Sequence, residues 1–456
     1  MRKKSRTAPR SAAPSLGDPA PPRTPWAERI AFGLVALLIL ITPLAMWSDA
    51  KDPFRLPKLL LAGILGAASL CALSFGRGLA ERWDLPGLWR RAAVRAVLPF
   101  VAVAALSWLW TRHRAYVGEG LIDLLVGASC LVAWSLALDS ERLRRLLELT
   151  FWPALVLSVV AVSQYLDIWE PLKFAQGEET HRLGVTGFAG NPGDLGSFLV
   201  LPCLLAQAQL ARLGRDGLRR PAAWIAAGTL VLSAIAIVTT QSLTAVAGLG
   251  VGTVVLWALL LPQRRALAIA GGGALLALVA LLAVAPLRER VVEKWGDLTS
   301  GNVNRLLTGR LDGWRAAIWM FEQAPVGGVG FGAYRARFGD ARLALVDEGV
   351  EFFRSQETPV FANAHNEYLE VAAEGGLLGL AALGWGLWVL GGTLRRQRAG
   401  AAASRDRRAD FALAAAGLAT LAVMALTFFQ LRIALTGFPS LLFLAWAFRS
   451  SEEAGG

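Results

Sequence analysis

The chain has 456 residues, of which 55% are hydrophobic and 18% charged, and its mean hydropathy is +0.48. Soluble domains are about 45–50% apolar with about a quarter of their residues charged, so this composition excludes an ordinary soluble protein. The net charge of +12 does not by itself indicate a nucleic-acid partner, because Lys and Arg gather in the cytoplasmic loops of membrane proteins. We predict an all-α polytopic membrane protein.

Twelve apolar runs are long enough to be membrane spans. They lie at about 30–47, 59–76, 96–110, 121–138, 147–165, 194–210, 222–240, 244–261, 266–285, 372–391, 411–429 and 435–448. Residues 1–29 are basic and rich in proline, which predicts a disordered tail, and residues 449–456 form a second, short tail. The transmembrane part is therefore predicted in two blocks, residues 30–285 and 372–448, separated by the hydrophilic residues 286–371.

The distribution of Lys and Arg indicates how these spans are oriented. Apart from residues 286–371, most basic residues fall in loops on the same side as the two tails. Because positively charged loops stay in the cytoplasm, both termini are predicted to be cytoplasmic and the long loop to lie on the outer side. Loops of this length are usually functional or disordered, and the Trp, Phe and Ile residues of this one argue against disorder. We expect short helices within it.

One candidate catalytic residue is His365, in the run Asn363-Ala364-His365-Asn366-Glu367 just before span ten. Asn363 can cap the helix that leads into the span, which would place His365 in the first helical turn. There the helix dipole disfavours the imidazolium, and a neutral imidazole can accept a proton from a hydroxyl group. The alternative is a structural histidine that bridges loop segments. Asn366 and Glu367 are the expected supporting residues.

A second candidate is Arg310, which precedes an expected amphipathic helix with Trp314, Ile318 and Phe321 on one face. A guanidinium beside a bilayer can hold a lipid phosphate through its fork of donors, and Arg305 lies nearby in the sequence. The alternatives are arginines that contact headgroups in general and a Trp314 that anchors the loop at the membrane interface.

A second outer loop contains Arg182 and the turn 187–193 with Asn191, and this loop could frame the same site. The histidines His113, His181 and His365 show no metal-ligand spacing, so we expect no metal site.

The glycines of residues 327–332 superficially resemble a nucleotide-binding loop. No strand precedes them, and we therefore expect a tight turn packed on the membrane surface instead.

At four places the sequence resembles the O-antigen ligase and O-antigen polymerase superfamily of bacterial envelope glycosyltransferases. They are Pro57-Lys58, Gly184 to Asn191-Pro192, the run from Thr308-Gly309-Arg310 through Trp314 and Pro325 to Gly328-Val329-Gly330, and Ala364-His365-Asn366-Glu367-Tyr368-Leu369-Glu370. With the predicted spans, the resemblance covers nearly the whole chain after residue 30. The last two motifs, in this order in one large outer loop, are its most specific part.

The resemblance implies a metal-independent transfer of a glycan from undecaprenyl pyrophosphate on the periplasmic side of the bacterial inner membrane, without a cofactor or a nucleic-acid partner. The acceptor would be a sugar of lipid A–core in a ligase, or a second lipid-linked repeat in a polymerase. His365 matches the loop histidine proposed to activate the acceptor, and Arg310 matches the arginine proposed to hold the pyrophosphate. Arg182 and Arg305 are further candidates for pyrophosphate binding, with Asn191 and Trp314 in supporting roles.

The sequence departs from the family pattern at one place. Many relatives carry an arginine after the serine at the outer end of the seventh or eighth span, and here Ser242 is followed by Leu243. Either another arginine substitutes or the donor is held differently. A ligase is the favoured interpretation, and an O-antigen or exopolysaccharide polymerase is the alternative. A transporter is a third interpretation, disfavoured because the centres of the spans are nearly free of ionisable residues.

Overall fold

The structure is a computed structural model that describes residues 25–76, 85–168, 184–262, 264–265, 285–352 and 361–455. Its helices are α1 (Pro25–Ile41), α2 (Arg55–Gly76), α3 (Leu85–Arg90), α4 (Ala92–Leu106), α5 (Arg114–Ala137), α6 (Ser140–Glu148), α7 (Phe151–Tyr165), α9 (Pro192–Gly217), α10 (Pro221–Thr240), α11 (Leu243–Leu260), α13 (Ala285–Thr299), α14 (Val303–Leu306), α15 (Arg310–Gln323), α16 (Tyr334–Asp347), α17 (Glu367–Gly400), α18 (Arg405–Met424) and α19 (Ala434–Gly455). Short 3-10 helices lie at η1 (Thr42–Leu44), η2 (Ser107–Leu109) and η3 (Gln430–Arg432). These residues contain no strand, which confirms the all-helical fold class.

Within the described residues, nine helical segments are long and apolar enough to cross a membrane, as a polytopic membrane protein requires. They coincide with predicted spans one to eight and ten. Predicted span nine, at 266–285, falls outside the described residues except at its last position, and so do residues 1–24 of the predicted tail. Helices α18 and α19 occupy predicted spans eleven and twelve but are not among the nine, because α18 begins with a charged turn and α19 mixes Thr, Gly, Pro and Ser with its apolar residues. The predicted count of twelve is therefore not confirmed.

Two helices, α9 and α19, form the centre of the bundle. Helix α9 packs against α10, α11 and α18, and α19 packs against α5, α6 and α17. The side chains of Leu442, Phe443 and Trp446 on α19 are almost completely buried, and α9 is the most buried of the nine candidate spans. A helix enclosed by other helices needs less apolar surface than one that faces lipid, which explains the modest hydropathy of α19.

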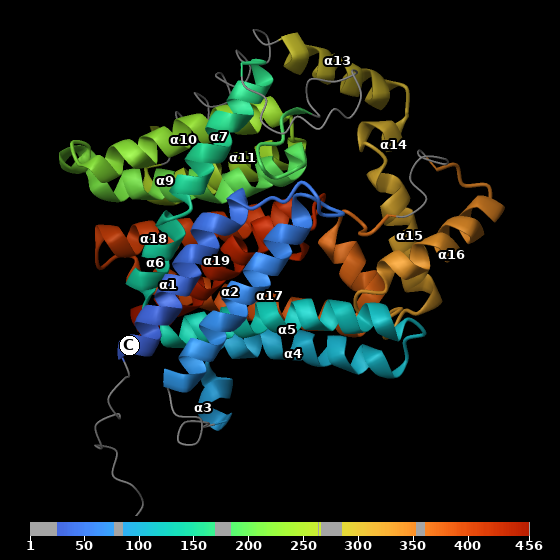
Figure 1. Cartoon of the computed structure of the whole chain (residues 1–456), viewed down its shortest axis with the longest axis horizontal. Helices are drawn as coiled ribbons and strands as arrows, with labels where there is room; N and C mark the ends of the chain where they lie inside the picture. Colours follow the sequence, from blue (N-terminus) through green and yellow to red (C-terminus); the bar gives the residue numbers. More distant parts are fainter. Residues whose placement is uncertain are drawn as a thin grey trace, which may run out of the picture.

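The residues between predicted spans nine and ten contain the four helices α13 to α16, which Figure 1 shows gathered toward the right of the view. Helices α15 and α16 share a small hydrophobic core around Met320, Tyr334 and Phe338, and this core extends to Ala364 and Ala373. The core therefore joins the loop helices to the segment that contains His365 and to the first turns of α17.

Helix α17 leaves the regular helical path at Gly376, whose φ and ψ are +58° and −152°. This region of backbone conformation is accessible almost only to glycine. Four backbone hydrogen bonds of 2.8–3.1 Å connect the break to the preceding loop, from Val329 to Ala373, from Gly330 to Glu374, from Leu377 to Pro325 and from Leu378 to Val326. The break in α17 is thus the docking place of the glycine-rich turn.

The glycines of residues 327–332 form a tight turn, as the sequence predicts, and the turn packs against other parts of the protein. Besides α17, it contacts the corner between α4 and α5, where Thr111 Oγ1 donates a hydrogen bond of 2.9 Å to the carbonyl of Val329. A Cβ atom on Gly328 would lie 2.3 Å from the backbone of Glu374, so this close approach requires glycine. The local sequence predicts the turn, but the segments on which it packs, α17 and the α4–α5 corner, lie elsewhere in the chain.

The replacement Gly376→Ala should destabilise the protein by about 2–3 kcal/mol, because alanine is strained at this φ and its Cβ would lie 2.5 Å from the backbone of Val326. The measurement is the thermal unfolding midpoint of the purified protein in detergent. The matched control is Gly384→Ala in the same helix, where a Cβ meets no atom within 4 Å. Equal midpoints for the two variants would contradict the assigned role of the break.

Candidate active site

His365 lies immediately before helix α17, with a backbone φ of +56°. The N-cap of α17 is Asn366, whose Oδ1 accepts hydrogen bonds of 3.0 Å from the backbone N–H groups of Tyr368 and Leu369. The expectation that Asn363 caps this helix and that His365 occupies its first turn is therefore wrong. Both asparagines can cap a helix, and Asn363 here donates a hydrogen bond of 2.9 Å from Nδ2 to Glu370.

Aromatic rings enclose the half-buried imidazole of His365 on two sides. Phe429 lies edge-on with ring centroids 4.9 Å apart, and Phe361 lies edge-on at 5.9 Å. Such edge-to-face contacts restrict the orientation of the ring. The side chain is therefore held in one place at the boundary between the bundle and the loop helices.

A single cation, Arg432 of η3, binds three carboxylates on one face of α17. Its guanidinium lies 2.7 Å from Glu374, 3.1 Å from Glu370 and 4.0 Å from Glu367. The positions i, i+3 and i+7 of a helix share a face, so one guanidinium can reach all three side chains. Burial lowers the pKa of Arg432, but the carboxylates outweigh this effect and the net pKa lies above its ordinary value. Arg432 is permanently charged.

The same carboxylates hold the loops around His365 through their remaining oxygen atoms. Glu370 Oε2 accepts a hydrogen bond of 2.9 Å from the backbone N–H of Ala364, the residue before His365. Glu374 Oε1 accepts one of 3.2 Å from the N–H of Tyr334 at the start of α16. Glu367 Oε1 accepts one of 3.2 Å from the N–H of Leu431. The Arg432 network thus connects α16, α17, the His365 segment and η3.

Arg310 is the first residue of α15 and has no carboxylate partner among the described residues. Its Nη1 donates to Thr308 Oγ1 at 3.0 Å, and its Nε is buried without a hydrogen-bond partner in the described structure. Burial, together with the positive charge of Arg290, lowers the pKa of Arg310. A half-buried cation without a counterion in the described part of the chain is suited to bind an anionic ligand.

Trp314 lies one helical turn after Arg310 on the same face of α15, and its Nε1 is buried and without a hydrogen-bond partner in the described part of the chain. Helix α15 reaches the His365 segment through Gly313, where a Cβ would lie 3.0 Å from the carbonyl oxygen of Ala364. The candidate residues on α15 and His365 therefore lie on two segments in direct contact.

The other predicted site residues have different surroundings. Arg305 is largely exposed and pairs with Asp297 at 3.4 Å, and Asn191 accepts a hydrogen bond of 2.7 Å from the N–H of Gly193 at the start of α9. Arg182 lies outside the described residues. His365, Asn366 and Glu367 are thus consecutive at the start of α17, Arg310 and Trp314 lie on a helix that contacts this segment through Gly313, and Asn191 has a local role in a turn.

Sequence reasoning missed Arg55, Asp194 and Arg432. Arg55 begins α2 and donates from Nε and Nη2 to Asp194 Oδ2 on α9, at 3.2 and 2.9 Å. Its guanidinium carbon lies 5.9 Å from the centre of the Phe429 ring, the ring that contacts His365. The signal available for these residues is a charged side chain at the end of an apolar span, which many membrane proteins show without a function.

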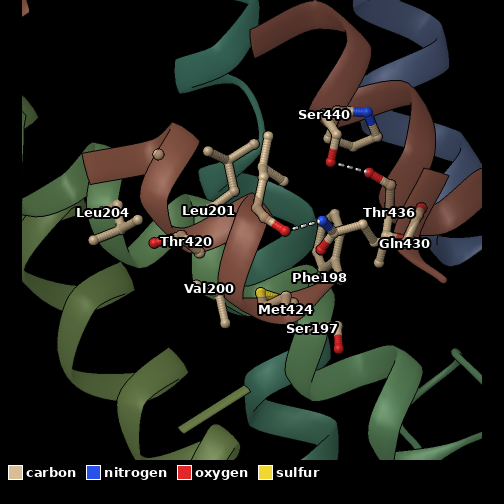
Figure 2. A pocket seen from close by; sticks show the side chains of 13 residues that line it. Ser197, Phe198, Val200, Leu201, Leu204, Thr420, Met424, Gln430, Thr436 and Ser440 are labelled. Atoms are coloured by element: carbon tan, nitrogen blue, oxygen red, sulfur yellow. Dashed lines mark hydrogen bonds between the residues drawn. The ribbon is translucent and has the colours of Figure 1, made fainter. Parts of the chain in front are cut away.

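A small pocket lies next to η3, between α9, α18 and α19 (Figure 2). Gln430, two residues before Arg432, lines it and donates from Nε2 to the carbonyl of Leu421 at 2.7 Å. The described lining residues are mainly apolar and include no titratable side chain, so we assign this cavity no part in the chemistry.

The described residues contain no group of three or more His, Cys, Asp or Glu side chains arranged to hold a metal ion. Residues 228–384, which include Arg310 and His365, match the O-antigen ligase family. None of the curated proteins matches the chain. Arg55, Asp194 and Arg432 lie outside the matched residues.

The replacement Arg432→Met should destabilise the protein by about 3–5 kcal/mol, because it leaves the buried Glu370 and Glu374 without their cation. The control is Arg335→Met, which breaks the exposed pair with Glu119 and should cost at most about 1 kcal/mol. Thermal unfolding in detergent measures both. A loss for Arg432→Met no larger than that of the control would show that the network does not hold these segments together.

Proposed function

We propose that the chain transfers a glycan from undecaprenyl pyrophosphate to a sugar hydroxyl of lipid A–core, because residues 228–384 match the O-antigen ligase family. The observation that carries the proposal is that the matched residues contain both Arg310 and His365, on segments in contact through Gly313 and Ala364. Ligase activity is the finer part of this proposal, since the same superfamily includes enzymes that join lipid-linked repeats.

The proposed location is the inner membrane, with both termini in the cytoplasm and residues 286–371 in the periplasm. The excess of Lys and Arg in the loops on the side of the termini supports this orientation. Residues 286–371 would then be the catalytic loop, between the transmembrane blocks 30–285 and 372–448. The lipid-linked donor and the lipid A–core acceptor would both reach the site from the bilayer.

His365 is the proposed general base. Its imidazole takes the proton from the acceptor hydroxyl while the hydroxyl oxygen forms a bond to the anomeric carbon of the donor glycan. The bond from that carbon to the pyrophosphate oxygen breaks, and its electron pair leaves with undecaprenyl pyrophosphate. The contacts of His365 with Phe429 and Phe361 support this role, because a base contributes most when its orientation is fixed.

Arg310 is the proposed site for the pyrophosphate. Its half-buried guanidinium has an unpartnered, buried Nε and no carboxylate partner among the described residues, and the start of helix α15 adds the positive end of a helix dipole. The indole N–H of Trp314 can donate to the same anion. Arg182 and Arg305 stay candidates by resemblance.

The variants His365→Gln and His365→Asn should lose at least about a hundredfold in transfer rate, because a positioned base contributes about 10²–10⁴-fold. Asparagine is the better structural substitute, since it adopts positive φ more readily than most residues. The measurement is transfer from purified lipid-linked donor by purified variants in detergent, with a chelator present. The control is His113→Ala, at the N-cap of α5, which should retain most activity. Near-normal turnover of both His365 variants would make this residue structural.

A strain that lacks the protein should accumulate long glycan chains on undecaprenyl pyrophosphate, because a missing ligase blocks transfer and leaves chain growth intact. Gel analysis of lipid-linked glycans and of lipopolysaccharide measures this. Complementation with the wild-type gene and with the His365→Asn variant provides the matched pair. Accumulation of single repeats only would indicate a polymerase instead.

A further inference from the structure

We propose that Arg55 is a second cationic residue of the site, binding the pyrophosphate of the donor. This inference rests on the proposed function. It assigns the phosphate-binding role to a residue outside the part of the chain that matches the family. Three features of the surroundings of Arg55 support it.

The first is that Arg55 is held in place while part of its guanidinium stays available. Asp52 Oδ1 accepts a hydrogen bond of 2.8 Å from the backbone N–H of Arg55 at the start of α2. The buried Asp194 binds Nε and Nη2, which fixes the plane of the guanidinium. Nη1 has no hydrogen-bond partner among the described residues, and 47% of the side chain is exposed. An oriented fork with free donors suits a phosphate.

The second feature is that Arg55 and the proposed base, His365, contact the same aromatic ring. Arg55 and His365 lie against the same ring, that of Phe429, with the guanidinium carbon 5.9 Å and the imidazole centroid 4.9 Å from its centre. A donor bound beside Phe429 can therefore place its pyrophosphate at Arg55 and its anomeric carbon near His365. In this arrangement the negatively charged leaving group forms next to the guanidinium of Arg55.

The third feature is that the neighbouring cation, Lys58, uses all its hydrogen-bond donors within the fold. Lys58, which belongs to the Pro57-Lys58 motif, donates to the carbonyls of Ala45, Phe188 and Phe54 at 2.6, 2.6 and 3.1 Å. An ammonium has three donors, so Lys58 is fully used in connecting backbone segments. Of these two cations at the start of α2, Arg55 is the one with donors left for a ligand.

The test compares the wild type with Arg55→Ala and Arg55→Lys, purified into lipid nanodiscs. Arg55→Ala should raise the KM for the lipid-linked donor at least about tenfold and leave the KM for the acceptor unchanged, because hydrogen bonds to charged groups are worth about 1.5–3 kcal/mol. Inorganic pyrophosphate should inhibit the variant less than the wild type. The control is Lys51→Ala, which removes an exposed charge from the preceding turn and should change neither value.

The phosphate that Arg55 binds could also belong to an ordinary lipid headgroup, and the nanodisc lipid distinguishes the two sources. With donor binding, the effect of Arg55→Ala persists in nanodiscs of phosphatidylcholine alone. An effect found only with phosphatidylglycerol would overturn the proposal and indicate a headgroup contact. A donor KM within twofold of the wild type would also overturn it.

If Arg55→Ala fails to fold, Arg55→Lys decides the question. Lysine keeps the charge beside Asp194 and loses the fork, so donor KM should rise and acceptor KM should not. An unchanged donor KM in a folded Arg55→Lys protein would then overturn the proposal. A wild type that transfers no glycan in these assays would instead contradict the proposed function, which separates the two failures.

Discussion

The contact on which the site depends is the one between the Arg432 guanidinium and the carboxylates of Glu370 and Glu374. Three buried or nearly buried acidic side chains on one helix face would repel one another, and a single cation from η3 makes their burial tolerable. Each carboxylate then has oxygen lone pairs left for backbone N–H groups of the surrounding loops. The network therefore sets the positions of segments that are far apart in the chain.

One consequence of the network is the conformation of His365. The residue has a positive φ, which is unfavourable for histidine, and such strain persists where neighbouring contacts over-determine the backbone. Glu370 holds the preceding Ala364, Asn366 caps α17, and Phe429 approaches from the segment that Arg432 holds. A strained residue held in this way is pre-organised, which is what a general base needs.

The cations around the site fall into two groups according to their partners. Lys58 and Arg432 are engaged by carbonyl or carboxylate oxygens, so they connect parts of the fold. Arg310 and Arg55 keep donors without a partner among the described residues, which leaves them able to hold an anion. Charge alone does not separate these roles; the number of satisfied donors does.

The sequence by itself determined the membrane class, most of the helical spans, the helices of the long loop and the two motifs that contain Arg310 and His365. These features are local: apolar runs, capping residues and short motifs are read over a few turns. Tertiary structure alone decided that Asn366 caps α17, that the glycine-rich turn docks on the break at Gly376, that Arg432 binds Glu370 and Glu374, and that Arg55 lies against Phe429. The contacts of the turn, of Arg432 and of Arg55 are with partners 40 or more residues away, and no local pattern encodes which distant side chain satisfies a donor.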